Sequence, residues 1–146
     1  MIAVDTNILV YAHRAEMSLH KAAITRMRAL VEGSTPWALP VFCIGEFLRV
    51  VTHSRIFHPA TDLETALTFL AQVLGSPSAR LLLPGATFPT LFAEACRDGA
   101  VLGNLAFDAQ LVAVCREHGV ATILTEDRDF GRFAKPTAVR LAQATT

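Results

Sequence analysis

The chain opens with a short apolar segment that ends abruptly at three polar residues. Ile2–Val4 is wholly apolar and too short for a helix, which favours a buried strand in the middle of a sheet. The Asp5-Thr6-Asn7 segment that follows favours turns and helix caps, and an apolar pattern then resumes. This order predicts a strand, a tight turn and a short helix, with Asp5 at the carboxyl end of a central strand, where open α/β sheets bind ligands. The alternative is that Asp5 or Thr6 only caps the helix.

The remaining sequence alternates short apolar runs with helical patterns. Extended segments are expected at 37–39, 80–83, 121–124 and 138–141, and helices at 18–32, 41–53, 63–74, 87–97 and 104–118. We expect the segment 80–83 to be buried and Pro40 to lie in the first turn of the helix 41–53. Short strands alternating with helices predict an α/β sandwich around a short parallel sheet. Without repeats or linkers, residues 1–146 are expected to form a single domain.

Composition limits the classes of function. The formal net charge is zero, so the overall balance indicates neither nucleic acid nor an anionic membrane as partner. The most apolar stretch, 40–51, is short and carries Glu46 and Arg49, so no membrane span is expected. A mean hydropathy of +0.40 is nevertheless high, which suggests an apolar face for a partner. The three cysteines lack metal-ligand spacing and are expected to be buried thiols in a reducing compartment.

Two carboxylates fall on helix faces that are otherwise apolar. Glu46 lies three residues from Cys43 on the same face of its predicted helix, and Asp108 lies within the apolar stripe of the helix 104–118. A buried carboxylate is normally paired, protonated or bound to a metal ion. Two simpler interpretations stay open: each carboxylate lies at the edge of its stripe in water, or Arg49 pairs with Glu46 along the helix.

A further acidic segment, Thr125-Glu126-Asp127-Arg128-Asp129, directly follows the predicted strand 121–124. By itself this segment is typical of a solvated turn. Together with the two inward-facing carboxylates, however, Asp127 and Asp5 at strand ends could converge at one edge of the sheet. No cluster of lysine or arginine accompanies them, so a hard divalent cation, Mg²⁺ or Mn²⁺, is the expected counter-charge.

Four motifs in this order resemble the PIN-domain ribonucleases, and most of all the VapC toxins of bacterial toxin–antitoxin pairs. They are V-D-T-N-I-L-V-Y-A, E-F-L-R-V, G-N-L-A-F-D-A-Q-L-V-A and T-E-D-R-D-F, whereas residues 55–102 match only in helical character. The resemblance implies a PIN-like three-layer α/β/α sandwich. It also implies that Asp5, Glu46, Asp108 and Asp127 form the catalytic, metal-binding set, supported by Thr6, Asn7 and Thr125. Asp129 also fits the fourth motif, and we rank Asp127 first because it is nearer the strand end.

The resemblance further implies a Mg²⁺- or Mn²⁺-dependent endoribonuclease that leaves a 5′-phosphate and a 3′-hydroxyl, and we expect the protein to be cytoplasmic. The expected partners are an RNA substrate, a VapB-like antitoxin and a second copy of the chain in a homodimer. We expect the antitoxin groove between the helices 18–32 and 41–53.

Three alternative functions are a PIN-fold binding module that has lost activity, a housekeeping nuclease without a toxin role, and a DNA flap nuclease. The intact acidic set argues against the binding module. The flap nucleases are usually much longer, with added DNA-binding elements.

Overall fold

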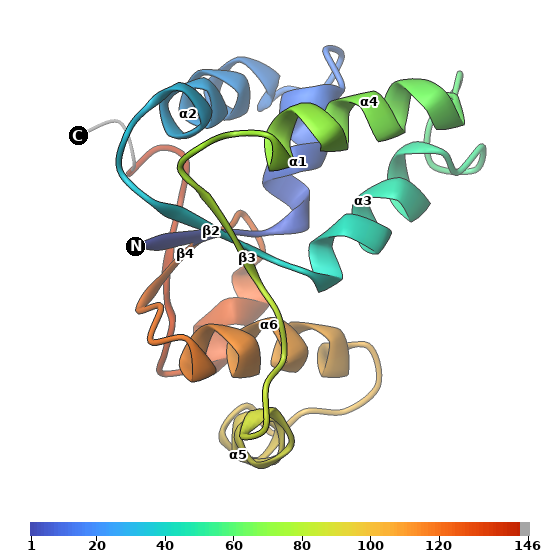
Figure 1. The fold of residues 1–146 in the computed structure, drawn as a ribbon. Coiled ribbons are helices and arrows are strands. Elements are labelled where there is room, and N and C mark those ends of the chain that lie inside the picture. Colours follow the sequence, from blue (N-terminus) through green and yellow to red (C-terminus); the bar gives the residue numbers. More distant parts are fainter. Residues whose placement is uncertain (144–146) are drawn as a thin grey trace.

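The computed structural model, which describes residues 1–143, contains a five-stranded parallel sheet (Figure 1). The strands are β1 (Ile2–Val4), β2 (Trp37–Pro40), β3 (Ala79–Leu82), β4 (Thr122–Leu124) and β5 (Thr137–Val139). Their order in the sheet is β3-β2-β1-β4-β5, and all neighbours pair in parallel. The first strand of the chain therefore lies at the centre of the sheet, where the opening apolar run predicted it.

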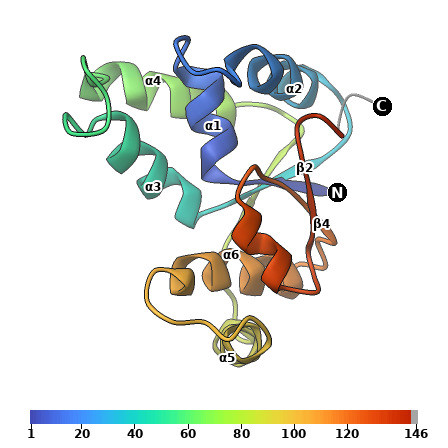
Figure 2. The ribbon, with the colours of Figure 1, turned by 180° about the vertical axis from the view of Figure 1, so that it is seen from behind.

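The helices cover both faces of this sheet, as predicted for a three-layer α/β/α sandwich. They are α1 (Thr6–His13), α2 (His20–Glu32), α3 (Phe42–Val51), α4 (Leu63–Leu74), α5 (Phe88–Asp98) and α6 (Leu105–Glu117), with a 3-10 helix η1 (Arg128–Arg132). Helices α1, α2 and α4 lie on one side of the sheet, and α6 lies on the other with α5 packed outside it (Figures 1 and 2). Helix α3 follows β2 and packs against α1 and α4.

Burial of apolar side chains explains why β1 is central. Ala3 and Val4 are fully buried, and Ala3 pairs with Ala38 of β2 and with Ile123 of β4, which are also fully buried. Trp37 and Phe47 are the largest side chains without exposed surface. A strand covered on both faces is stabilised by removing its apolar side chains from water, which accounts for the continuous apolar sequence of β1, although Ile2 at its start is only partly buried.

Two local expectations were wrong. Pro40 is the last residue of β2 rather than part of a helix, because Val41 N donates to Leu82 O at 3.0 Å and so continues the ladder past the proline. A proline that ends a strand loses little, since only its missing N–H is withdrawn from the ladder. The segment predicted as a buried strand at 80–83 is the edge strand β3, and Arg80 and Leu81 are exposed because no further strand covers that edge.

Within residues 1–143, no helix combines the length and the apolar character that crossing a membrane requires.

Candidate metal-binding site

Asp5 caps helix α1 with one carboxylate oxygen and joins a network of polar side chains at the strand ends with the other. It therefore lies at the carboxyl end of the central strand β1 and also serves as a helix cap. Its backbone is extended, and Asp5 N donates to Leu124 O at 3.0 Å, which continues the pairing of β1 with β4. Oδ1 accepts from Thr6 N at 2.7 Å and thereby caps α1. Oδ2 accepts from Asn7 Nδ2 at 2.9 Å and from Thr125 Oγ1 at 2.8 Å. One oxygen starts the helix, and the other belongs to a side-chain network.

The network joins the two strand ends through Thr125, which is fully buried. Its hydroxyl donates to Asp5 and accepts from Asn7 Nδ2 at 3.1 Å and from Asp127 N at 3.0 Å. The side-chain oxygen of Asn7 accepts from Glu126 N at 3.2 Å. These bonds hold the turn after β1 against the segment after β4, so the positions of Asp5 and Asp127 are coupled.

Asp108, Asp127 and Asp129 form a tight acidic cluster. One carboxylate oxygen from each lies within 4.8 Å of the others. Asp108 comes from the first turn of α6, and Asp127 is the N-cap of η1, with its Oδ1 accepting from Asp129 N at 2.9 Å. Within residues 1–143, the Asp108 carboxylate accepts no hydrogen bond. Asp127 and Asp129 both belong to this cluster, so their positions do not decide which of them is the fourth acidic ligand. Asp127 is half-buried and Asp129 is exposed.

Glu46 lies across from this cluster on α3. Its Oε2 accepts from Thr6 Oγ1 at 3.3 Å, and the residue is half-buried. The buried face of α3 is formed by Cys43, Phe47 and Val51, so Glu46 lies at the edge of that face. In the described part of the chain Arg49 makes no ion pair with Glu46, in contrast to the pairing considered from their spacing.

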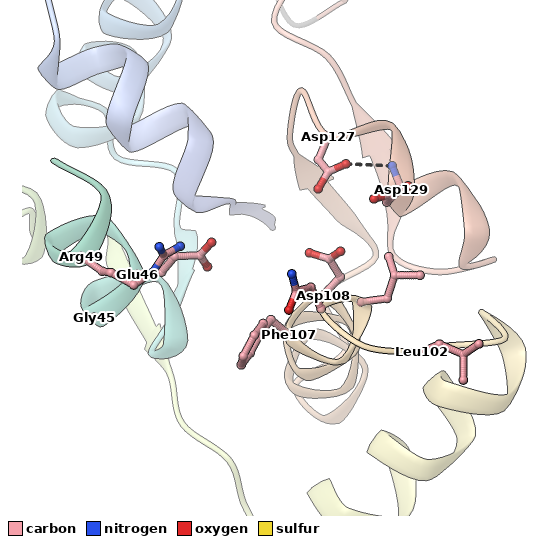
Figure 3. Close-up of a pocket in the computed structure, with 10 residues that line it drawn as sticks. Gly45, Glu46, Arg49, Leu102, Phe107, Asp108, Asp127 and Asp129 are labelled. Atoms are coloured by element: carbon pink, nitrogen blue, oxygen red, sulfur yellow. Dashed lines mark hydrogen bonds between the residues drawn. The ribbon is translucent and has the colours of Figure 1, made fainter. Parts of the chain in front are cut away.

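A cleft of about 830 Å³ separates the two sides (Figure 3). Glu46 and Arg49 lie on its α3 side, and Asp108, Asp127 and Asp129 lie on the opposite side. Its other lining residues are Gly45, Leu102, Asn104, Leu105 and Phe107. A smaller pocket of about 340 Å³ is lined by Asp5, Thr6 and Asn7 and shares three residues with the cleft, namely Glu46, Asp108 and Asp127. The four predicted carboxylates therefore converge where the two hollows meet.

Burial and like charge make two of these carboxylates hard to ionise. Burial is the main cause that raises the pKa of Asp5 from 3.8 to about 6, partly offset by the hydrogen bonds from Thr125 and Thr6. Burial also raises the pKa of Asp108 from 3.8 to about 7, with further contributions first from Asp127 and then from the other carboxylates.

The charge of the cluster is not neutralised by the protein. The ion pairs within residues 1–143 are Arg14–Glu16, Arg116–Asp98 and Arg140–Glu126, and none involves a carboxylate of the cluster. Oxygen ligands from several carboxylates at short mutual distance are the donor set that a hard divalent cation prefers. The residues present therefore fit such an ion, and they do not discriminate between Mg²⁺ and Mn²⁺.

The antitoxin groove expected between the helices 18–32 and 41–53 stays a prediction, but it does not coincide with the two hollows beside the carboxylates. Helix α2 contributes no residue to either hollow, because α1 lies between it and the site. The apolar wall of the smaller pocket consists of Val10, Tyr11, Met17, Val50, Ile56 and Phe57. Sequence reasoning missed Phe107 and Leu102 in the larger cleft. The apolar character of these two residues was visible, but their exposure was not.

Comparisons with known proteins identify the family of the chain and agree with its fold. Residues 2–136 match the PIN domain family. The chain is 36% identical over 135 residues to ribonuclease VapC43 of Mycobacterium tuberculosis, covering 92% of this chain and 91% of the relative. Its fold is similar to the crystal structure of VapC20 from M. tuberculosis, a sarcin-ricin loop cleaving toxin (TM-score 0.67, 18% identity, 90% and 93% of the two chains). It is also similar to VapBC2 from Rickettsia felis, solved bound to a DNA fragment from its promoter (TM-score 0.68, 19% identity, 96% and 98%). The chain therefore belongs to the PIN-domain family and, within it, to the VapC ribonucleases.

Proposed function

We propose that this protein is a metal-dependent endoribonuclease that acts as the toxin of a toxin–antitoxin pair. The observation that carries the proposal is the group of three unneutralised carboxylates, Asp108, Asp127 and Asp129, whose oxygens lie within 4.8 Å of one another beside a cleft of about 830 Å³. The VapC relatives are named ribonucleases, which supports RNA as the substrate. We propose that residues 1–146 act as a single PIN-like nuclease domain.

Asp5, Glu46, Asp108 and Asp127 are the proposed catalytic residues and metal ligands. Asp129 is a further candidate ligand because it shares the cluster. When bound, Mg²⁺ or Mn²⁺ would lower the pKa of a water molecule and offset the charge of the phosphodiester.

Thr6, Asn7 and Thr125 are proposed supporting residues because their hydrogen bonds orient the carboxylates of Glu46 and Asp5. No side chain of the protein has to form a covalent intermediate. Water attacks phosphorus, and the bond from phosphorus to the 3′-oxygen breaks. The products are a 5′-phosphate and a 3′-hydroxyl.

We also propose a VapB-like antitoxin as partner, in a cytoplasmic complex built on a homodimer. The solved VapBC2 relative supports this partner class. The smaller pocket suits the antitoxin chain, because an apolar wall there leads to Asp5 and Glu46. A basic side chain entering that pocket would supply positive charge in place of the metal ion and would block the substrate.

The test compares wild type with Asp5→Asn on total RNA in the presence of Mg²⁺, Mn²⁺ or EDTA. We expect cleavage by wild type with metal and none with EDTA or with the variant. Glu94→Gln is the matched control, since Glu94 is an exposed carboxylate of α5 away from the site.

Expression of the chain alone should arrest growth, and co-expression of the neighbouring antitoxin gene should restore it. A harmless protein that binds metal but cuts no RNA would favour the binding-module alternative.

A further inference from the structure

Two exposed apolar residues beside the acidic cluster have no role in the fold. Phe107 is 60% exposed and Leu102 is 83% exposed, and neither packs against the hydrophobic core. Both line the large cleft, and Phe107 directly precedes Asp108 in the first turn of α6 (Figure 3). An aromatic ring that remains exposed at a cleft offers a large apolar face for a ligand to cover.

Arg49 is the second unexplained group. It is exposed on α3, and within residues 1–143 its guanidinium has neither an ion pair nor a hydrogen bond. Among the described residues that line the cleft, it is the only lysine or arginine. The free cation and the aromatic ring therefore belong to one hollow that also contains the carboxylates of Asp108 and Asp127 (Figure 3).

Arg49 and Phe107 could contact the two parts of a nucleotide that the acidic cluster does not bind by itself, namely a phosphate and the base. Phosphates approaching the carboxylates meet negative charge, so a cation at the side of the cleft lowers the energy of the approach. A nucleobase offers a flat apolar face, and stacking of bases on aromatic side chains is a general way in which proteins bind single strands. The cleft volume of about 830 Å³ lies within the range of ligand pockets.

We propose that Phe107 and Arg49 are positioning residues that hold an unpaired nucleotide next to the scissile phosphate, with the base stacked on Phe107 and a neighbouring phosphate bound by Arg49. This inference rests on the proposed ribonuclease function and adds to it two residues outside the acidic set, one that contacts a base and one that contacts a phosphate. Bases inside an A-form duplex are stacked on both faces and do not present one to Phe107.

A protein partner could also cover an exposed phenylalanine. The position of Phe107 favours the nucleotide, because the ring lines the same cleft as the carboxylates and shares it with Arg49, whose guanidinium has no partner in the described part of the chain.

The experiment uses the shortest synthetic RNA that wild type cleaves at one mapped phosphodiester, in single-turnover reactions with Mg²⁺. Phe107→Ala should raise the half-saturating enzyme concentration by about tenfold, and Phe107→Trp should restore it, since stacking on one base is commonly of this size. An abasic nucleotide placed in turn at each position of the RNA should weaken wild type at one position beside the cut. Phe107→Ala should be insensitive at that position.

Arg49 is tested by the salt dependence of the same constant. Arg49→Ala should reduce the slope of the logarithm of this constant against the logarithm of salt concentration by about 0.7, the value for one phosphate contact on a single strand. Arg49→Lys should recover the slope. Arg28→Ala is the matched control, because Arg28 is exposed on α2, which does not line the cleft, and its slope should equal that of wild type.

Three results would overturn the inference. Wild type that cuts no RNA would remove the proposed function and this inference with it. Normal cleavage by wild type with unchanged constants in Phe107→Ala and Arg49→Ala would remove the inference alone. A changed molar mass of Phe107→Ala in light scattering, together with unchanged cleavage constants, would assign Phe107 to a protein contact instead.

Discussion

Replacing Asp108 by asparagine should stabilise the metal-free protein. The pKa of the Asp108 carboxyl is raised from 3.8 to about 7, and within residues 1–143 the side chain accepts no hydrogen bond that asparagine would lose. In a fully buried group this rise would correspond to about 4 kcal/mol. Because Asp108 is only half-buried, solvent screens the interaction, and we expect about 1–2 kcal/mol. A gain of this size corresponds to roughly 3–6 °C in melting temperature for a chain of this length.

The effect has a defined dependence on pH. A carboxyl whose pKa is higher in the folded than in the unfolded state stabilises the fold fully below the unfolded pKa, near 4, and this contribution is lost as pH rises through about 7. Asparagine does not titrate. The difference in melting temperature between Asp108→Asn and wild type should therefore be near zero at pH 4, should grow between pH 4 and 7, and should be constant above pH 7.

Thermal denaturation followed by circular dichroism in EDTA, from pH 4 to 9, measures this difference. Glu94→Gln is the control and should differ little from wild type at any pH, because Glu94 is exposed and lies outside the site. Addition of Mg²⁺ should stabilise wild type and narrow the gap. The reasoning is refuted if Asp108→Asn melts at or below the wild-type temperature at pH 8 without metal.

Further predictions concern the metal, the fourth ligand, assembly and the thiols. Millimolar Mg²⁺ or Mn²⁺ should raise the melting temperature of wild type by preferential binding to the folded state, and the absence of both a shift and calorimetric heat would contradict the site. Asp127→Asn should reduce the initial rate of RNA cleavage more than Asp129→Asn, because Asp127 lines both hollows, and the reverse order would make Asp129 the fourth ligand. Static light scattering should give the mass of a dimer, and a monodisperse monomer would contradict the proposed assembly. Burial raises the pKa of the Cys43 thiol well above its usual range and that of Cys115 to about 12, so a thiol reagent at pH 8 should label only Cys96 in the native protein. Mass spectrometry should then show rapid labelling of all three cysteines after denaturation, and fast native labelling of Cys115 would be inconsistent with its burial.

Local sequence determined the elements and the placement of Asp5. A three-residue apolar run followed by cap-forming residues was sufficient to predict β1, its turn and α1, because a strand buried on both faces tolerates no polar side chain. Helical periodicity placed Glu46 and Asp108 among apolar positions, and the structure shows both residues half-buried, with Glu46 at the edge of the buried face of α3. The burial of β3 was not predictable, since an apolar run does not reveal whether another strand will cover the edge.

Only the tertiary structure decided which groups meet. Thr125 donates to Asp5 across a separation of 120 residues, and this contact exists because β4 pairs with β1. The same strand order brings Asp127 and Asp129 to Asp108, whereas Glu46 approaches from the other side on α3. Periodicity along one helix cannot report such distances, because they depend on how separate elements pack. For the same reason, the exposure of Phe107 and the lack of a partner for Arg49 among residues 1–143 became visible only once the elements were packed around the cleft.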